Sequence, residues 1–263
     1  MKGIHIDFIF YSLLFTLALL IVRSYRWQLV IIHTLGEKAC YKECFFSYLY
    51  GLAPGLLTPG RVGEIFRIMP LVRFQKKILV ELFVIDKYIE MTALFIVSTI
   101  GSYLLELNKL FIVSLSVLSI LIVLFFARQK WVFIFRKLIF KLTRREIKLI
   151  FKEVKGIYFI YYLILSVVAL IFDISAFYFI INAMVALNFK VCLLVFPMML
   201  IAVVLPVSIS GIGVREAVAV YFLSFFHITP EVSFNASILI FVIGSIIPAL
   251  IGWIIGIYKF SRL

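Results

Sequence analysis

Long uninterrupted apolar runs constrain the fold of this chain more than any other feature of its sequence. Residues 110–127, 157–181 and 234–257 are almost entirely aliphatic, aromatic or small, and a helix of about 20 apolar residues crosses the hydrocarbon core of a bilayer. Lipid offers backbone groups no hydrogen-bond partner, so only helices or closed barrels can span it. The runs are continuous rather than alternating, which favours helices. The sequence therefore predicts an all-α, polytopic membrane helix bundle.

Composition supports a membrane protein and excludes several other classes. Hydrophobic residues make up 65% of the chain and charged residues 15%, whereas soluble domains are about a quarter charged. The formal net charge is +13, but the basic residues cluster at the edges of the apolar runs, as they do in membrane proteins. This placement argues against nucleic-acid binding. The three cysteines form no disulfide framework, and we expect no metal and no other cofactor.

The apolar segments divide into full spans and shorter, interrupted segments. Arg23 and Arg26 are expected to end the first span. The five full spans are expected at residues 8–22, 78–105, 110–127, 157–181 and 234–257. We expect two further segments to be re-entrant or broken helices that enter from opposite sides: residues 44–57, and residues 191–207 with 217–226. Transporters use such an arrangement to build central binding sites.

Charge predicts the orientation of these spans. The segments after the first span, after residue 57 and after residue 127, together with the C-terminus, are basic and are therefore expected in the cytoplasm. The N-terminus is then external, and the protein is expected in the plasma membrane. Residues 128–155 carry ten basic side chains interleaved with aromatic ones. We expect this stretch to be amphipathic and to lie on anionic lipid.

A first charged motif occupies residues 58–67, Thr-Pro-Gly-Arg-Val-Gly-Glu-Ile-Phe-Arg. Thr58 suits an N-cap and Pro59 suits the first helical position, so a helix is expected to start here. Its charged side chains are spaced three residues apart and would share one face, where a phosphate or carboxylate could bind beside the helix start. The alternative is an ordinary capped helix with a surface ion triplet. The motif's charged residues and close-approach glycines are Arg61, Glu64, Arg67, Gly60 and Gly63.

A second motif follows the interrupted segment at residues 206–216. Pro206 is expected to end one helix, Gly211 and Gly213 permit a sharp turn, and Arg215 and Glu216 are expected to open the next helix. Backbone donors and an arginine would again lie together in an apolar setting; the alternative is a tight external loop. The motif also includes two serines, Ser208 and Ser210.

A third group of charges lies inside an expected span. Asp86, Lys87 and Glu90 have spacings of three and four residues, and each charge at the centre of a bilayer costs roughly 2.5–3.5 kcal/mol on insertion scales. Such groups must face protein or water. They are either binding residues or a structural ion pair that locks helices together. Asp173 lies alone in another span and is a further candidate for the binding site, and we expect an arginine as its partner.

Together these motifs resemble the lysylphosphatidylglycerol synthase transmembrane-region family. The resemblance rests on Pro-Gly-Arg-x-Gly-Glu-x-x-Arg from Pro59, on Pro-x-Ser-x-Ser-Gly-Ile-Gly-x-Arg-Glu from Pro206, and on Asp86-Lys87-x-x-Glu90, where the family usually has Glu-Arg-x-x-Asp. It implies a flippase-like domain over residues 1–263 that moves a polar lipid between leaflets, best known for aminoacylated phosphatidylglycerol. It implies a lipid-handling role for the charged residues of the three motifs. It also implies one further helix before the first one here, and we expect no soluble aminoacyl-transfer domain of the kind found in bifunctional members.

Three functions follow as hypotheses. The first is a translocator, and not an enzyme, for an anionic or zwitterionic phospholipid, a glycolipid or a polyprenyl-linked lipid. The second is a membrane-embedded transferase that uses Asp86 or Asp173 as base, and the third is a non-catalytic partner of a separate lipid-modifying enzyme. The chain has no Walker-type ATP-binding loop, so movement would be passive or ion-coupled. The sequence is also compatible with a homo-oligomer.

Overall fold

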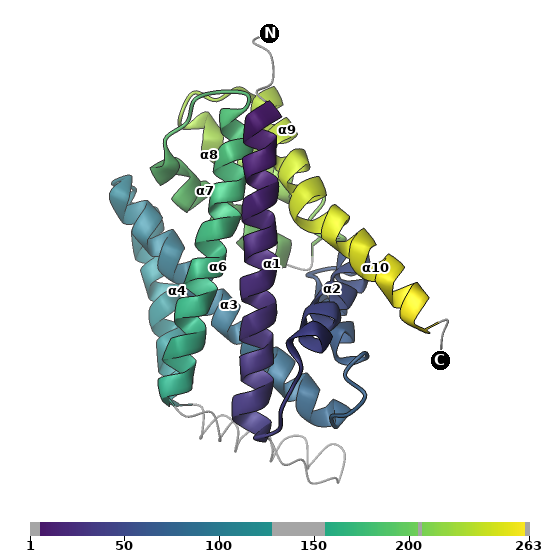
Figure 1. Cartoon of the computed structure of the whole chain (residues 1–263). Coiled ribbons are helices and arrows are strands. Elements are labelled where there is room, and N and C mark those ends of the chain that lie inside the picture. The colour runs from purple at the N-terminus through teal and green to yellow at the C-terminus, as the bar shows by residue number, and fades with distance from the viewer. Residues whose placement is uncertain (1–5, 128–155, 205–206, 261–263) are drawn as a thin grey trace.

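The computed structural model describes residues 6–127, 156–204 and 207–260, and within these ranges the regular elements are all helical. The expected amphipathic stretch at 128–155 and Pro206 therefore lie outside the described residues. Figure 1 shows long helices beside one another with shorter helices between them. The all-α bundle predicted from the apolar runs is confirmed.

Five long helical segments match the five expected spans. Four are long and apolar enough to cross a membrane: α1 (Ile6–Leu35), α4 (Asn108–Phe126), α6 (Gly156–Asn182) and the continuous segment Pro230–Tyr258. The last contains α9 (Pro230–Phe241), the π-helical turn η3 (Val242–Ile246) and α10 (Ile247–Phe260). The fifth, α3 (Lys76–Leu104), has 29 residues, which is about 43 Å at 1.5 Å per residue, but its charges set it apart from the apolar four.

Two half-length hairpins enter this bundle from opposite ends. One is α2 (Tyr41–Leu57) followed by the 3-10 helix η1 (Val62–Ile68), and the other is α7 (Phe189–Val204) followed by α8 (Val214–Ser224). Their tips meet near the middle of the bundle (Figure 1) through an antiparallel bridge between Pro59 and Ile209. The Ser210 N–H also donates to the Thr58 carbonyl at 3.5 Å. The expected pair of broken helices is thus present, and each hairpin shields the other's non-helical backbone from lipid.

The structure corrects the expected end of the first span. The helix α1 does not stop at the two arginines that follow residue 22 but continues to Leu35. Arg26 is only 1% exposed, and its guanidinium lies among acidic side chains of another helix. A charge normally ends a span because burial costs solvation energy. Here the ion pairs with acidic side chains offset the lost solvation energy, so α1 continues past both arginines.

The structure also corrects the helix start expected at Thr58. This residue is the extended C-cap of α2, and the next helix begins at Val62 as a 3-10 turn. The intervening Gly60 and Arg61 have positive φ angles of 60° and 55°, so the backbone reverses before it can form a helix. The Thr58 hydroxyl still caps this turn by accepting the Gly63 N–H at 2.7 Å.

Glycine is required where the first hairpin closes on itself. A Cβ atom on Gly63 would collide with the Pro54 carbonyl, and one on Gly51 would lie 2.6 Å from the Arg67 Cβ. Close backbone approach of this kind is a known use of glycine. It lets α2 and η1 pack directly together and holds the charged residues of η1 in a fixed place.

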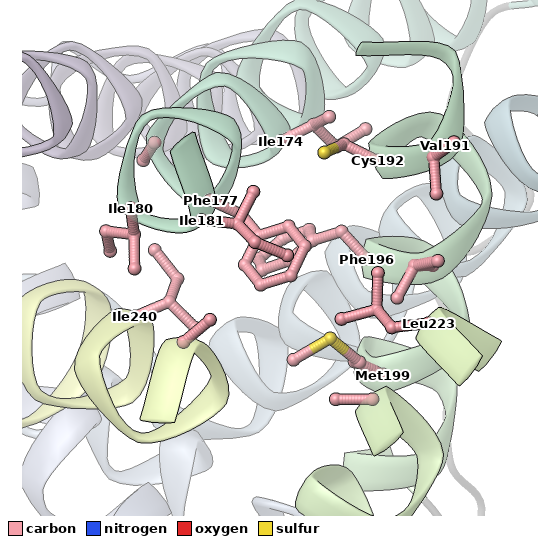
Figure 2. Packing of buried hydrophobic residues seen from close by; sticks show 14 of the residues in the cluster. Ile174, Phe177, Ile180, Ile181, Val191, Cys192, Phe196, Met199, Leu223 and Ile240 are labelled. Carbon is pink, nitrogen blue, oxygen red and sulfur yellow. The ribbon is translucent and has the colours of Figure 1, made fainter. Parts of the chain in front are cut away.

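Two larger apolar clusters hold the long helices around the hairpins, and a smaller third one joins α2 to α1 and α10. In the largest one, Phe177 of α6 contacts Phe196 of α7 at a ring separation of 5.2 Å, and Met199, Leu223 and Ile240 pack around them (Figure 2). This cluster fixes the second hairpin against α6 and α9. The second joins α1, η1, α3 and α6 and includes the fully buried Trp27. Packing therefore immobilises the elements that carry the charged motifs.

The first hairpin should return the chain to the side from which it entered. With the exposed Cys40 replaced by serine, single cysteines at Glu37 and Gln75 are expected to react with an impermeant thiol reagent from one side of the membrane, and a cysteine at Glu106 from the other. Labelling of intact cells and of inverted vesicles measures this. Reaction of positions 37 and 75 from opposite sides would contradict the re-entrant hairpin.

Candidate functional site

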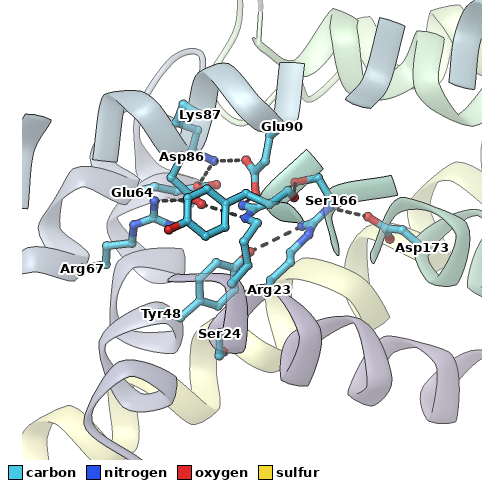
Figure 3. A network of polar contacts seen from close by, with 12 residues as sticks. Arg23, Ser24, Tyr48, Glu64, Arg67, Asp86, Lys87, Glu90, Ser166 and Asp173 are labelled. Carbon is cyan, nitrogen blue, oxygen red and sulfur yellow. Dashed lines mark hydrogen bonds and ion pairs between the residues drawn. The ribbon is translucent and has the colours of Figure 1, made fainter. Parts of the chain in front are cut away.

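The charged residues of α3 form the centre of a polar network inside the bundle (Figure 3). Asp86 is completely buried and accepts hydrogen bonds from two arginines, from Nε of Arg26 at 2.8 Å and from Nη2 of Arg67 at 2.5 Å. Charge-assisted hydrogen bonds of this length are among the strongest in proteins. Asp86 thus ties α1 and η1 to α3.

One turn further along α3, Glu90 continues the network. It accepts hydrogen bonds from Nη2 of Arg26 at 2.7 Å and from Nζ of Lys87 at 2.8 Å. The Lys87 ammonium also pairs with Glu64 of η1, and Arg26 donates to the Ser166 hydroxyl of α6 at 2.5 Å. The three motif residues of α3 therefore contact α1 and η1, and Arg26 extends the network to α6.

A second link joins α1 to α6. Nη2 of Arg23 lies 3.0 Å from Oδ2 of Asp173, and its Nη1 donates to the Tyr48 hydroxyl at 3.5 Å (Figure 3). The expected arginine partner of Asp173 is confirmed. The charge pair removes the cost of an isolated carboxylate within a span.

The guanidinium of Arg67 is packed between aromatic rings inside the bundle. It is stacked over the Trp27 ring at 4.2 Å and the Phe83 ring at 4.7 Å, and the side chain is only 1% exposed. Aromatic faces attract a guanidinium by cation–π interaction. With Asp86 on its edge and rings on its faces, Arg67 is enclosed by protein.

Among the network cations, Arg61 has the most distant carboxylate partner. Its Nη2 donates to the Ser245 hydroxyl of η3 at 2.8 Å, while its nearest carboxylate, Glu64, is 3.8 Å away. Its Nε is buried without a hydrogen-bond partner. A buried guanidinium N–H without an acceptor is costly, so this side chain has capacity for a further acceptor.

The second motif forms a separate charged pair at the start of α8. Arg215 pairs with Glu216, donates through Nε to the Ser237 hydroxyl at 3.1 Å, and lies 4.1 Å from the Phe241 ring centroid. Glu216 also accepts the Gly213 N–H at 2.6 Å. The predicted opening of a helix at Arg215 and Glu216 is confirmed, as is the turn, since Gly211 and Gly213 have φ angles of 73° and 84°. In the same turn, the Ser208 and Ser210 hydroxyls are buried without partners.

A cavity of about 460 Å³ lies against this network. Four basic and two acidic side chains border it, and aliphatic residues of α3, α4, α6 and α7 complete its wall. The charged wall consists of Arg23, Arg26, Arg61, Lys87, Glu64 and Glu90. A smaller cavity of about 40 Å³ shares two of these arginines and reaches Arg215. The volume of the larger cavity falls in the usual range for small-molecule sites.

The structure separates the predicted site residues into three groups. Arg61, Glu64, Lys87 and Glu90 border the large cavity, and Asp173 and Arg215 border the small one. Asp86 and Arg67 lie behind the cavity wall and position its residues. Glu216 pairs with Arg215, and the turns at the hairpin tips contain Pro59, Gly60, Gly211 and Gly213.

Sequence reasoning missed the part of α1 that faces the site. Arg23 and Arg26 were assigned to a membrane boundary, and nothing singled out Tyr48, Ser166 or Ser245. One signal was present, because the apolar run resumes directly after Arg26 with residues 27–32. Arginines three residues apart with apolar sequence on both sides lie on one helix face, and such a face requires partners.

Comparison with protein families identifies one match. The family model described as "Lysylphosphatidylglycerol synthase TM region" matches residues 3–252, nearly the whole chain. A comparison with curated proteins finds no match. Among the described residues, no group of three or more His, Cys, Asp or Glu side chains is arranged to hold a metal ion.

Proposed function

Because the chain belongs to the lysylphosphatidylglycerol synthase transmembrane-region family, whose members are membrane proteins related to lipid handling, we propose that it translocates a lipid with a polar head group between the leaflets. The observation that carries this proposal is the cavity between the helices, which is lined by both charged and aliphatic side chains. Charged groups inside a span are expensive and usually mark a substrate pathway. A lipid has a polar head group and apolar acyl chains, which match the charged and the aliphatic side chains of the cavity.

In this proposal the charged wall takes the place of water around the head group. Arg61 and Lys87 offer N–H donors to a phosphate, while Glu90 offers an acceptor to hydroxyl or amino groups. Leu94, Leu121 and other aliphatic side chains provide an apolar surface for the first part of the acyl chains. The head group then crosses the bilayer without complete desolvation, which is the main barrier to its unassisted movement.

The two hairpins would give access from the two sides in turn. In many secondary transporters, discontinuous helices meet at a central site, and alternating access comes from movement of one part against the other. The tips here meet through the bridge between Pro59 and Ile209. The conformational change would be driven by the lipid gradient or by ions.

The arrangement favours translocation over the transferase alternative. That reaction would use Asp86 or Asp173 as a general base. However, Asp86 is ion-paired with two arginines and Asp173 is ion-paired with Arg23. A base needs a free lone pair within reach of its substrate, and Asp86 is fully buried behind the cavity wall. The third alternative, a partner of a separate lipid-modifying enzyme, is compatible with translocation.

Leaflet exchange of labelled phospholipid in proteoliposomes tests the proposal. The purified protein is expected to accelerate exchange, and Arg61→Ala is expected to slow it by roughly ten- to a hundredfold, because hydrogen bonds to charged groups contribute about 1.5–3 kcal/mol. Arg61→Lys should also slow exchange, since an ammonium lacks the planar fork of a guanidinium. The matched control is Arg73→Ala, which removes an exposed arginine outside the cavity. Normal exchange by folded Arg61→Ala protein would exclude Arg61 from the lipid pathway.

A further inference from the structure

The charges of the polar network do not balance. Among the described residues, the ion pairs of this network connect five basic side chains with four acidic ones, which leaves a formal charge of +1. The basic residues are Arg23, Arg26, Arg61, Arg67 and Lys87, and the acidic ones are Glu64, Asp86, Glu90 and Asp173. The neighbouring Arg215 and Glu216 form a neutral pair and leave this surplus unchanged.

The contacts locate the surplus at Arg61. Arg23 is matched by Asp173 at 3.0 Å. The three cations Arg26, Arg67 and Lys87 are linked to the three carboxylates Asp86, Glu90 and Glu64 by contacts of 2.8 Å or less. Arg61 remains, because its nearest carboxylate oxygen is 3.8 Å away.

The position of Arg61 directs this surplus toward the cavity. The residue borders both the large and the small cavity, together with Arg23. Its backbone adopts the left-handed conformation, with φ 55°, which non-glycine residues adopt only when the surrounding structure imposes it. Here the tip of the first hairpin holds it, and the Ser245 hydroxyl fixes one end of the guanidinium.

We propose that the cavity selects lipids whose head group carries a single net negative charge, that is, a phosphodiester without an amine. This inference rests on the proposed function and specifies its substrate class. A monoanionic head group at Arg61 makes the occupied network neutral. A zwitterionic head group leaves the surplus of +1, and a lysylated head group, which itself carries a net charge of +1, raises it to +2. Net charge is expensive in a low-dielectric interior, so the three classes differ in affinity.

Binding of short-chain lipids to the intact protein in a neutral detergent tests the selectivity directly. The probes are dihexanoyl phosphatidylglycerol, dihexanoyl phosphatidylethanolamine and lysyl-phosphatidylglycerol of matched chain length, with soluble glycerol phosphate as a fourth arm. The measured quantity is the affinity from the lipid-dependent shift of the unfolding temperature. We expect phosphatidylglycerol to bind at least about tenfold more tightly than either amine-bearing lipid. Equal or tighter binding of an amine-bearing lipid would overturn the inference, and so would equally strong binding of glycerol phosphate, which would assign the site to a free phosphate.

Substitution at Arg61 provides the second arm. Arg61→Gln removes the surplus charge and keeps a polar side chain, so the preference for phosphatidylglycerol over phosphatidylethanolamine should fall to about one. Arg73→Gln removes an exposed charge instead and should keep the preference. An unchanged preference in Arg61→Gln would overturn the assignment of the surplus to this residue.

Leaflet exchange measured on the same preparations separates this inference from the proposed function. Selective binding without any acceleration of exchange would refute translocation and leave the charge selectivity of the site supported. Acceleration of exchange that does not distinguish the three lipids, with no selectivity in binding, would support translocation and refute the selectivity.

Discussion

Asp86→Ala is expected to lower the free energy of unfolding by about 3–5 kcal/mol, the usual effect of removing one partner from a buried ion pair. Asp86 is fully buried and is the acceptor for both Arg26 and Arg67. Without it, the network would carry an additional unmatched positive charge inside the membrane. Arg67 would be the most affected, because Asp86 is its carboxylate partner among the described ion pairs.

Unfolding of the purified protein in mixed detergent micelles measures this effect. Glu37→Ala is the matched control, because it removes an exposed carboxylate outside the network and surface substitutions usually change stability by less than about 0.5 kcal/mol. Asp86→Asn should give an intermediate loss, since the amide oxygen can still accept one hydrogen bond but carries no charge. If Asp86→Ala is as stable as Glu37→Ala, the network contributes nothing to the fold.

A disulfide between the two hairpin tips is expected to stop lipid exchange completely. Residues that face each other in an antiparallel bridge have Cα atoms about 4.5–5.5 Å apart, which lies within the range that a disulfide spans. Pro59→Cys and Ile209→Cys occupy such a bridge. If exchange requires the hairpins to separate, the oxidised double variant should exchange lipid only at the rate of protein-free vesicles.

The reduced form of the same protein is the control. Reduction should restore the exchange rate of the double variant, which shows that the bond and not the substitutions caused the loss. Each single variant should respond to neither oxidant nor reductant once the exposed Cys40 is replaced by serine; Cys44 and Cys192 are buried and free. Normal exchange by the oxidised double variant would show that the tips stay together during transport.

The helical elements were largely predictable because the bilayer simplifies the problem. A span must be a helix and must have a minimum length, so the apolar runs at 110–127 and 157–181 predicted α4 and α6 to within two residues at each end. Proline and glycine in a segment too short to cross likewise predicted α2 as a half-length helix. These are properties of one segment and its solvent, and each can be recognised without knowledge of the rest of the chain.

The pairing of charges was not predictable in the same way. Arg23 and Asp173 are 150 residues apart, and Arg26 and Asp86 are 60 apart. An arginine after an apolar run has two outcomes, a membrane boundary or a buried ion pair, and the outcome depends on whether a carboxylate from another helix reaches it. Without that partner, the boundary is the less costly solution, which is why the sequence favoured the wrong end for α1.

The sequence by itself thus determined the membrane environment, the helical class, the spans and the presence of three charged motifs, because burial of apolar surface and satisfaction of backbone hydrogen bonds are local requirements. Only the tertiary structure decided which charges face the cavity. It placed Asp86 and Arg67 behind the wall, brought Arg23 and Arg26 to its surface, and left Arg61 with the most distant carboxylate among the cations of the described network. Ion pairs inside a membrane form between distant segments because each buried charge must find an opposite one, and the packing of the helices determines which one it reaches.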